Sequence, residues 1–203
     1  RHALKAAQDP DDYADKAERL AWGQEAEKAG HGDVFYGDVF YGDGSGFCLT
    51  SAIPYGWQFP GEHVATRPRH SPRLNVLGFY NAATNDLCAN ACEGSMNAAF
   101  VVEAIDAWAA TRTRPTVLVL DNASIHHAAA FRARLQAWEE QDVHIFHLPA
   151  YSPHLNKIET LLWCKVKYEW LRPEATADCK TLKTAVWHIL DRVGLQFTIQ
   201  FAT

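Results

Sequence analysis

The sequence predicts an α/β domain in which a mixed β-sheet carries helices on both faces. Strand-like segments come first along the chain, and helical and strand-like segments alternate after them. The run from Thr116 to Leu120 is continuously apolar, as is typical of a central strand covered on both sides. Val101, Ile105 and Trp108 follow helical spacing, which places their apolar side chains on one face of a helix. Together these observations favour a layered sheet with helical crossovers.

Composition fits one well-packed domain. The chain has 203 residues, of which 48% are hydrophobic and 21% charged. No apolar run approaches the roughly 18 residues that a membrane span needs, so no membrane association is expected. The five cysteines are scattered and odd in number, which favours a reducing cytoplasm. We expect an N-terminal helix within residues 1–30 and a single domain over residues 31–203. The net charge of −5 counts weakly against DNA binding, unless clustered acids are neutralised by metal.

The N-terminal part predicts one helix and then a strand. Residues 10–29 have the composition and spacing of an amphipathic helix. A tandem repeat, GDVFYGDVFYGDG, follows at residues 32–44. Each repeat has five residues, so the two copies cannot occupy equivalent places in one strand, where side chains alternate with period two. We interpret the second copy, Asp38 to Tyr41, as the strand that enters Asp43.

The remaining segments complete the α/β pattern. Apolar runs and turn signals mark the strands, and apolar residues three and four apart mark the helices. The predicted strands are 47–53, 74–80, 86–93, 116–120 and 143–148, and the helices contain residues 101–108, 131–138, 155–166 and 182–189.

Three acids stand where this architecture would bring them together. Asp43 follows an apolar strand and precedes glycines that let the backbone turn, although Asp33 or Asp38 would take its place if the other copy is the relevant one. Asp121 follows the buried strand at its carboxyl end, where open α/β sheets place ligands. Glu159 stands beside the apolar stripe of a helix and is expected to point inward, where an unpaired carboxylate would be costly.

Each acid also has a simpler structural interpretation. Asp43 could be a turn residue, Asp121 could cap the helix that begins near Ser124, and Glu159 could complement a helix dipole. Against these, carboxylates from two strand ends and one helix suit a pair of Mg²⁺ or Mn²⁺ ions about 3.5–4 Å apart. Such a pair activates an attacking oxygen and stabilises a leaving oxygen in phosphoryl transfer.

Several strings share the order and spacing of one known family. They are DGSGF (43–47), YGW (55–57), RLNVLGFYN (73–81), VLDNASIHH (119–127), FHLPAYSPHLNKIE (146–159) and KYEWL (167–171). From about residue 30 onward, the sequence resembles the catalytic core of DDE transposases, in particular the bacterial insertion-sequence branch of the mariner superfamily. Three features depart from the family pattern: Gly44, Lys157, and one extra residue between Glu159 and Trp163.

The resemblance implies an RNase H-like, retroviral-integrase-like fold with a mixed five-stranded sheet. It implies metal-dependent cut-and-paste transposition at TA dinucleotides, with Asp43, Asp121 and Glu159 as the triad that holds two Mg²⁺ or Mn²⁺ ions. Asn122 and His126 could orient metal-bound water or a phosphate, or could make structural hydrogen bonds. The expected partners are the transposon terminal repeats, the target DNA and a second protomer bound to DNA, in a bacterial cytoplasm at the nucleoid. An upstream DNA-reading module is expected outside these 203 residues.

Two basic segments are candidate DNA contacts, with a solvated surface as the alternative for each. The first is a proline-containing loop with Arg67, Arg69 and Arg73. The second is the helix downstream of Glu159, with Lys165 and Lys167. Two other functions remain open at this point: a different RNase H-like nuclease, or a catalytically silent DNA-binding or dimerisation module derived from a transposase.

Overall fold

A computed structural model describes residues 9–29, 37–50, 73–92 and 94–200. In these residues five strands form one mixed sheet in the order β3-β2-β1-β4-β5. The central strand β1 pairs antiparallel with β2 and parallel with β4, and β5 continues the parallel side. This is the mixed sheet that the sequence predicts. The strands are β1 (Asp38–Phe47), β2 (Leu74–Asn81), β3 (Leu87–Cys92), β4 (Thr116–Leu120) and β5 (Val143–His147).

Alternating side chains of the strands build a separate apolar core on each face of the sheet. On β1, Val39 and Tyr41 point to one face, where they pack with Val119. Phe40, which lies between them, points to the other face and packs with Leu118. The parity of a residue along β1 or β4 therefore decides which layer of helices its side chain meets.

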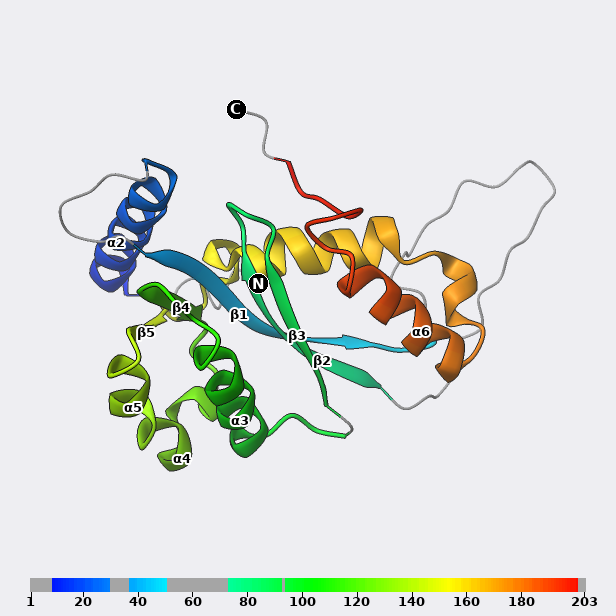
Figure 1. The fold of residues 1–203 in the computed structure, drawn as a ribbon, viewed down its shortest axis with the longest axis horizontal. Helices are drawn as coiled ribbons and strands as arrows, with labels where there is room; N and C mark the ends of the chain where they lie inside the picture. The colour runs from blue at the N-terminus through cyan, green and yellow to red at the C-terminus, as the bar shows by residue number, and fades with distance from the viewer. Residues whose placement is uncertain (1–8, 30–36, 51–72, 93, 201–203) are drawn as a thin grey trace.

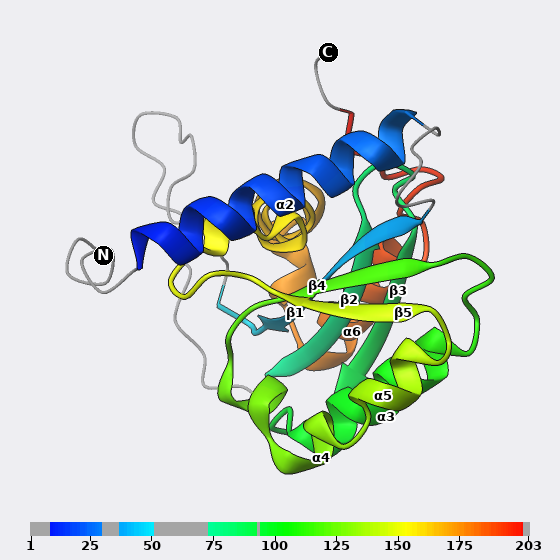
Figure 2. The same cartoon turned by 90° about the vertical axis from the view of Figure 1, so that its left-hand side faces the viewer.

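Helices cover both faces, as Figure 2 shows with the sheet seen nearly edge-on. The face of Phe40 is covered by α3, α4 and α5, and the face of Tyr41 by η3, η4, α6 and α2. Leu20 of α2 is buried in the same core as Tyr41. The helices are α2 (Pro10–Ala29), α3 (Ala98–Ala109), η1 (Ser124–His127), α4 (Ala129–Arg132), α5 (Leu135–Glu139), η2 (Pro153–Leu155), η3 (Ile158–Trp163), η4 (Val166–Trp170), η5 (Pro173–Thr176) and α6 (Cys179–Leu190).

Three predicted elements differ from the observed ones. Instead of beginning a new strand, Phe47 ends β1. Residues 49–50 form a bend, and the rest of the predicted strand lies outside the described residues. The helix expected over 131–138 is divided into α4 and α5, at a point where Arg134 turns to bond Asp106 of α3 at 2.9 Å.

The long helix after residue 155 is the third difference, because it consists largely of wide π-type turns. Its carbonyls accept from residues five positions later, as in the 2.9 Å bond from the Leu171 amide to the Val166 carbonyl. Such turns take one more residue than an α-turn and often occur at functional sites. They supply a structural place for the extra residue between Glu159 and Trp163.

Two further expectations concern the membrane and the cysteines. None of the helices in the described part of the chain has the length and apolarity needed to cross a bilayer. All five cysteines lie within the described residues, and all five are free thiols.

Candidate active site

Asp43 lies within β1 rather than at its end, because the strand continues to Phe47. This corrects the prediction that a turn begins there. The parallel pairing of β1 with β4 stops at Tyr41 and Val119, so Asp43 stands two residues beyond the last pair. It has the same parity as Tyr41 and therefore faces the layer that contains η3.

Asp121 stands in the matching position on the neighbouring strand. It is two residues beyond Val119 and follows the last residue of β4. Its Oδ1 lies 3.0 Å from Nδ1 of the buried His126 and accepts from the Ala123 amide at 3.1 Å. The hydrogen bond from His126 is the main reason why the pKa of Asp121 is held below its usual value. The helical turn of Ser124–His127 has Ala123 at its N-cap with no side-chain bond, so Asp121 does not cap it.

Glu159 lies in the first turn of η3. Ile158 and Leu162 take the sheet-facing side of this helix and are completely buried, whereas Glu159 is exposed. The prediction that the Glu159 carboxylate is buried was therefore wrong, and the cost of burying a charge is no argument for a cation at this residue. Glu159 and Asp121 instead line the same cavity of about 370 Å³.

Two residues without an assigned role in the sequence analysis hold η3 against β1. Asn156 is 1% exposed, and its Nδ2 donates to the carbonyl of Gly42, next to Asp43, at 3.3 Å. The Asn156 carbonyl accepts from the Glu159 amide at 3.1 Å. Gly78 pairs with Asp43 across β1 and β2, and a Cβ on Gly78 would lie 2.9 Å from Ile158. The missing Cβ therefore lets η3 approach the sheet beside Asp43.

The electrostatics place the three carboxylates in one region. Burial, followed by the negative charges of Glu159 and Asp121, raises the pKa of Asp43 to about 7. Lys167 is the cation that opposes this shift. Concentrated negative charge of this kind is a frequent property of functional sites, and a bound cation would relieve it.

The donor set fits a hard divalent cation in its chemistry, because Mg²⁺ and Mn²⁺ prefer carboxylate oxygens. In the described part of the chain, however, no three His, Cys, Asp or Glu side chains lie close enough together to form a ready metal-binding group. Asp43 is near enough to Glu159 and Asp121 for their charges to raise its pKa. The three carboxylates nevertheless do not form a compact group, so they would have to move closer together to share an ion.

The two auxiliary residues have different surroundings. His126 is buried beside Asp121, as described above. Asn122 donates from Nδ2 to the Leu148 carbonyl at 2.7 Å, and its Oδ1 lies 3.1 Å from Nε2 of His127. These contacts fix the loop after β4 and occupy both ends of the Asn122 amide.

The predicted DNA contacts are placed unevenly. Arg67 and Arg69 lie outside the described residues. Arg73 is exposed just before β2, with its guanidinium over Gly46 in the space that a Cβ would need. Lys165 is paired with Glu169 at 2.7 Å, whereas Lys167 is half-buried and feels the charges of Asp43 and Glu159.

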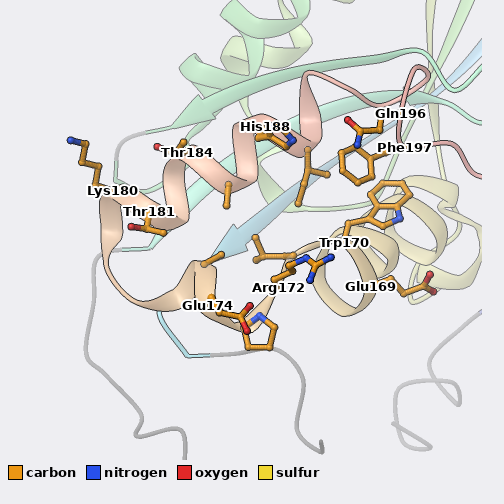
Figure 3. A pocket seen from close by; sticks show the side chains of 15 residues that line it. Glu169, Trp170, Arg172, Glu174, Lys180, Thr181, Thr184, His188, Gln196 and Phe197 are labelled. Carbon is orange, nitrogen blue, oxygen red and sulfur yellow. The ribbon is translucent and has the colours of Figure 1, made fainter.

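A larger cavity lies elsewhere. It measures about 1170 Å³ and lies between η4, η5, α6 and the C-terminal segment, with Trp170, Arg172, His188 and Phe197 among its walls (Figure 3). None of the three acids lines it. We assign the candidate active site to the smaller carboxylate cavity, because chemistry identifies a reactive site better than size does.

Comparison with known proteins adds independent support for the fold. Among solved structures, the chain is similar to a pre-cleavage Mos1 transpososome, with 15% identity, a TM-score of 0.60, and coverage of 90% of this chain and 56% of that chain. It is similar to the Mos1 strand transfer complex, with 16% identity, a TM-score of 0.59, and coverage of 89% and 53%. For the catalytic domain of Mos1 mariner transposase the identity is 13%, the TM-score is 0.55, and the coverage is 90% and 82%.

These identities are low enough that the structural likeness establishes the shared fold, which is RNase H-like. The chain spans about half the length of the proteins in the two complexes. No significant relative was found among curated proteins. A family model described as DDE superfamily endonuclease matches residues 38–183, which include Asp43, Asp121 and Glu159. Because that match covers more than half of the sequence, the chain belongs to the DDE superfamily endonucleases.

Proposed function

We propose that this chain is the catalytic domain of a DNA transposase, with Asp43, Asp121 and Glu159 as its metal-binding triad. The observation that carries the proposal is the pKa of Asp43, raised to about 7 by burial and by the charges of Glu159 and Asp121. The three carboxylates repel one another, and a bound cation would remove that repulsion. The match to a family of endonucleases supports such a metal-binding role.

Two Mg²⁺ or Mn²⁺ ions, when bound, would activate the attacking oxygen and stabilise the leaving one. The residues of this chain divide the remaining work. His126 keeps Asp121 ionised, since its hydrogen bond lowers the pKa of that carboxylate. Asn156 ties the first turn of η3 to the strand of Asp43. A 3′-hydroxyl freed by hydrolysis of one strand would then attack target DNA, and no covalent intermediate with the protein is required.

The finer assignments rest on the sequence resemblance. We propose cut-and-paste transposition at TA dinucleotides, membership of the bacterial insertion-sequence branch of the mariner superfamily, and a homodimer that pairs two transposon ends. We also retain the division into an N-terminal helix within residues 1–30 and a catalytic domain over 31–203, and a place at the bacterial nucleoid. The similarity of the fold to those of a Mos1 strand transfer complex and a pre-cleavage Mos1 transpososome supports a DNA substrate.

The primary test is nicking of a labelled transposon-end duplex in Mg²⁺. Asp121→Asn keeps the shape of the side chain and removes its charge, so nicking should fall by at least about 100-fold if one metal ligand is lost. The exposed Asp191, which caps α6, provides the matched control, and Asp191→Asn should nick at the wild-type rate. Unchanged nicking by Asp121→Asn would reject the triad.

A catalytically silent module is the second candidate. It is favoured by the observation that no three potential ligands in the described residues lie close enough for a ready metal site. Calorimetry with Mn²⁺ separates the two, because the silent module should bind no ion. Strand-transfer products on a supercoiled target would in turn distinguish a transposase from another RNase H-like nuclease.

A further inference from the structure

A basic pocket adjoins the candidate active site farther along β1. Its volume is about 330 Å³, and its walls include Phe47, Lys167, Tyr168, Arg172 and Thr176. Among the residues that the structure describes, no aspartate or glutamate lines it. It differs in this respect from the carboxylate cavity of Asp121 and Glu159. Glu159 of η3 lines that cavity, whereas Lys167 and Tyr168 of η4 line the basic pocket.

The cations around this basic pocket have no carboxylate partner in the part of the chain that the structure describes. Within the described residues, Lys167, Arg172 and the neighbouring Arg73 form no ion pair with a carboxylate within 4.0 Å. Lys165, two residues before Lys167, is neutralised by Glu169 at 2.7 Å. In a chain with a net charge of −5, an unpaired cluster of this kind is a local site of positive potential.

Lys167 connects the basic pocket to the carboxylates. Its ammonium lies 5.7 Å from the centre of the Phe47 ring, and it is attracted by Asp43 and Glu159 while Arg73 repels it. Lys167 is eight positions after Glu159, a distance of at most about 12 Å along the axis at the α-helical rise, and less where the turns are widened. A DNA strand advances by about 3.4 Å per nucleotide, so the two ends of this span are a few nucleotides apart.

Tyr168 adds an aromatic surface at the same place. Its side chain is 53% exposed, although large aromatic rings are usually more buried. A flat exposed ring beside unpaired cations is the combination that single-stranded nucleic acids use, with the base stacked on the ring and the phosphate near the positive charge. The volume of the basic pocket falls at the lower end of the range for small-ligand sites, about 300–1,000 Å³.

We infer that the basic pocket binds one unpaired nucleotide of the DNA strand, with its base on Tyr168 and its phosphate between Lys167 and Arg172. This inference rests on the proposed function and adds the direction in which the strand leaves the carboxylates, toward Phe47. The large cavity beyond Arg172 is a weaker place for DNA, because Glu169 and Glu174 also line it.

The test measures binding of a fluorescently labelled single-stranded deoxyoligonucleotide by anisotropy, in EDTA so that no metal contributes. Tyr168→Ala should weaken binding about 5- to 100-fold, the range expected for loss of one stacked base, whereas Tyr168→Phe should bind as the wild type does. Arg172→Gln should weaken binding and reduce the dependence of log Kd on log salt by about 0.7, the value for one phosphate contact on a single strand. The exposed Arg132, on α4 at the other face of the sheet, is the matched control, and Arg132→Gln should change neither quantity.

Kinetics provide the second measurement. On the transposon-end duplex in Mg²⁺, Tyr168→Ala should raise KM and leave kcat within about twofold, because the ring contacts DNA away from the reacting phosphate. Wild-type affinity in both Tyr168→Ala and Arg172→Gln would overturn the inference, as would a wild type that does not bind the oligonucleotide. A wild type that binds the oligonucleotide and does not nick would refute the proposed function and leave the basic pocket standing.

Discussion

Replacing Asp43 with asparagine should make the metal-free protein more stable at neutral pH. The pKa of Asp43 is raised from 3.8 to about 7 in the folded protein, so the folded state holds this proton more tightly than the unfolded chain does. The contribution of the protonated group is complete below about pH 4 and is lost as the pH rises to about 7. Because the pKa rises from 3.8 to about 7, ionisation of Asp43 lowers the free energy of unfolding by on the order of 4 kcal/mol. Asp43→Asn removes that loss.

Thermal unfolding in EDTA measures the effect. At pH 8 the melting temperature of Asp43→Asn should exceed that of the wild type by at least about 5 °C, since 1 kcal/mol shifts a domain of this size by about 2–4 °C. At pH 4 the two proteins should melt together. Adding Mn²⁺ at pH 8 should stabilise the wild type by mass action and should stabilise the variant much less.

A second aspartate on the same strand provides the control. Asp38 is paired with Arg114 at 3.0 Å at the start of β1, so Asp38→Asn should be neutral or slightly destabilising at pH 8. Equal melting temperatures for Asp43→Asn and the wild type at pH 8 would refute the reasoning, because they would mean that neither burial nor the charges of Glu159 and Asp121 raise the pKa of Asp43.

Three further substitutions test the framework around the triad. Asn156→Ala leaves the Gly42 carbonyl without its side-chain donor, so urea unfolding should show a loss of about 1–3 kcal/mol in stability. We also expect a fall in kcat for nicking with little change in KM, and an unaltered kcat would contradict the positioning role. His126→Phe removes the hydrogen bond that lowers the pKa of Asp121, so Mn²⁺ affinity by calorimetry should fall more at pH 5 than at pH 8, and a loss of equal size at both pH values would contradict this. Gly78→Ala places a methyl group against η3 at 2.9 Å; urea unfolding should show about 1–3 kcal/mol of destabilisation, and unchanged stability would mean that η3 is not held where we describe it.

The sequence was informative wherever a period or an apolar run carried the information. The run from Thr116 to Leu120 predicted an interior strand that is covered on both faces, and β4 has these bounds and lies between β1 and β5. The two aspartates are also related by strand register, since Asp43 and Asp121 both stand two residues beyond the paired Tyr41 and Val119. Their common face follows from the alternation of side chains once the register is known.

The sequence was less informative where tertiary contacts decide the outcome. The exposure of Glu159 depends on Ile158 and Leu162 taking the sheet-facing positions of a widened helix, and a regular α-helical spacing does not predict that widening. The role of Asn156 depends on its contact with Gly42, which is 114 residues away in the sequence. Its position in the turn directly before the helix of Glu159 was the one local signal.

The two lysines of the same helix illustrate a similar limit. Lys165 and Lys167 are equivalent as basic residues downstream of Glu159. In the structure, Glu169 neutralises Lys165 at 2.7 Å, whereas Lys167 turns toward Phe47 and the carboxylates. Because turns of different width rotate the side chains by different amounts, sequence spacing alone did not separate them.

The central claim is that Asp43, Asp121 and Glu159 can close on a common divalent cation. Anomalous diffraction from crystals of this chain soaked in Mn²⁺ tests it most directly, because manganese is located independently of the protein atoms. We expect a manganese peak between the three carboxylates, with oxygen ligands from Asp43 and from at least one of the other two acids. Manganese peaks at other sites, with no peak between the three carboxylates, would contradict the claim.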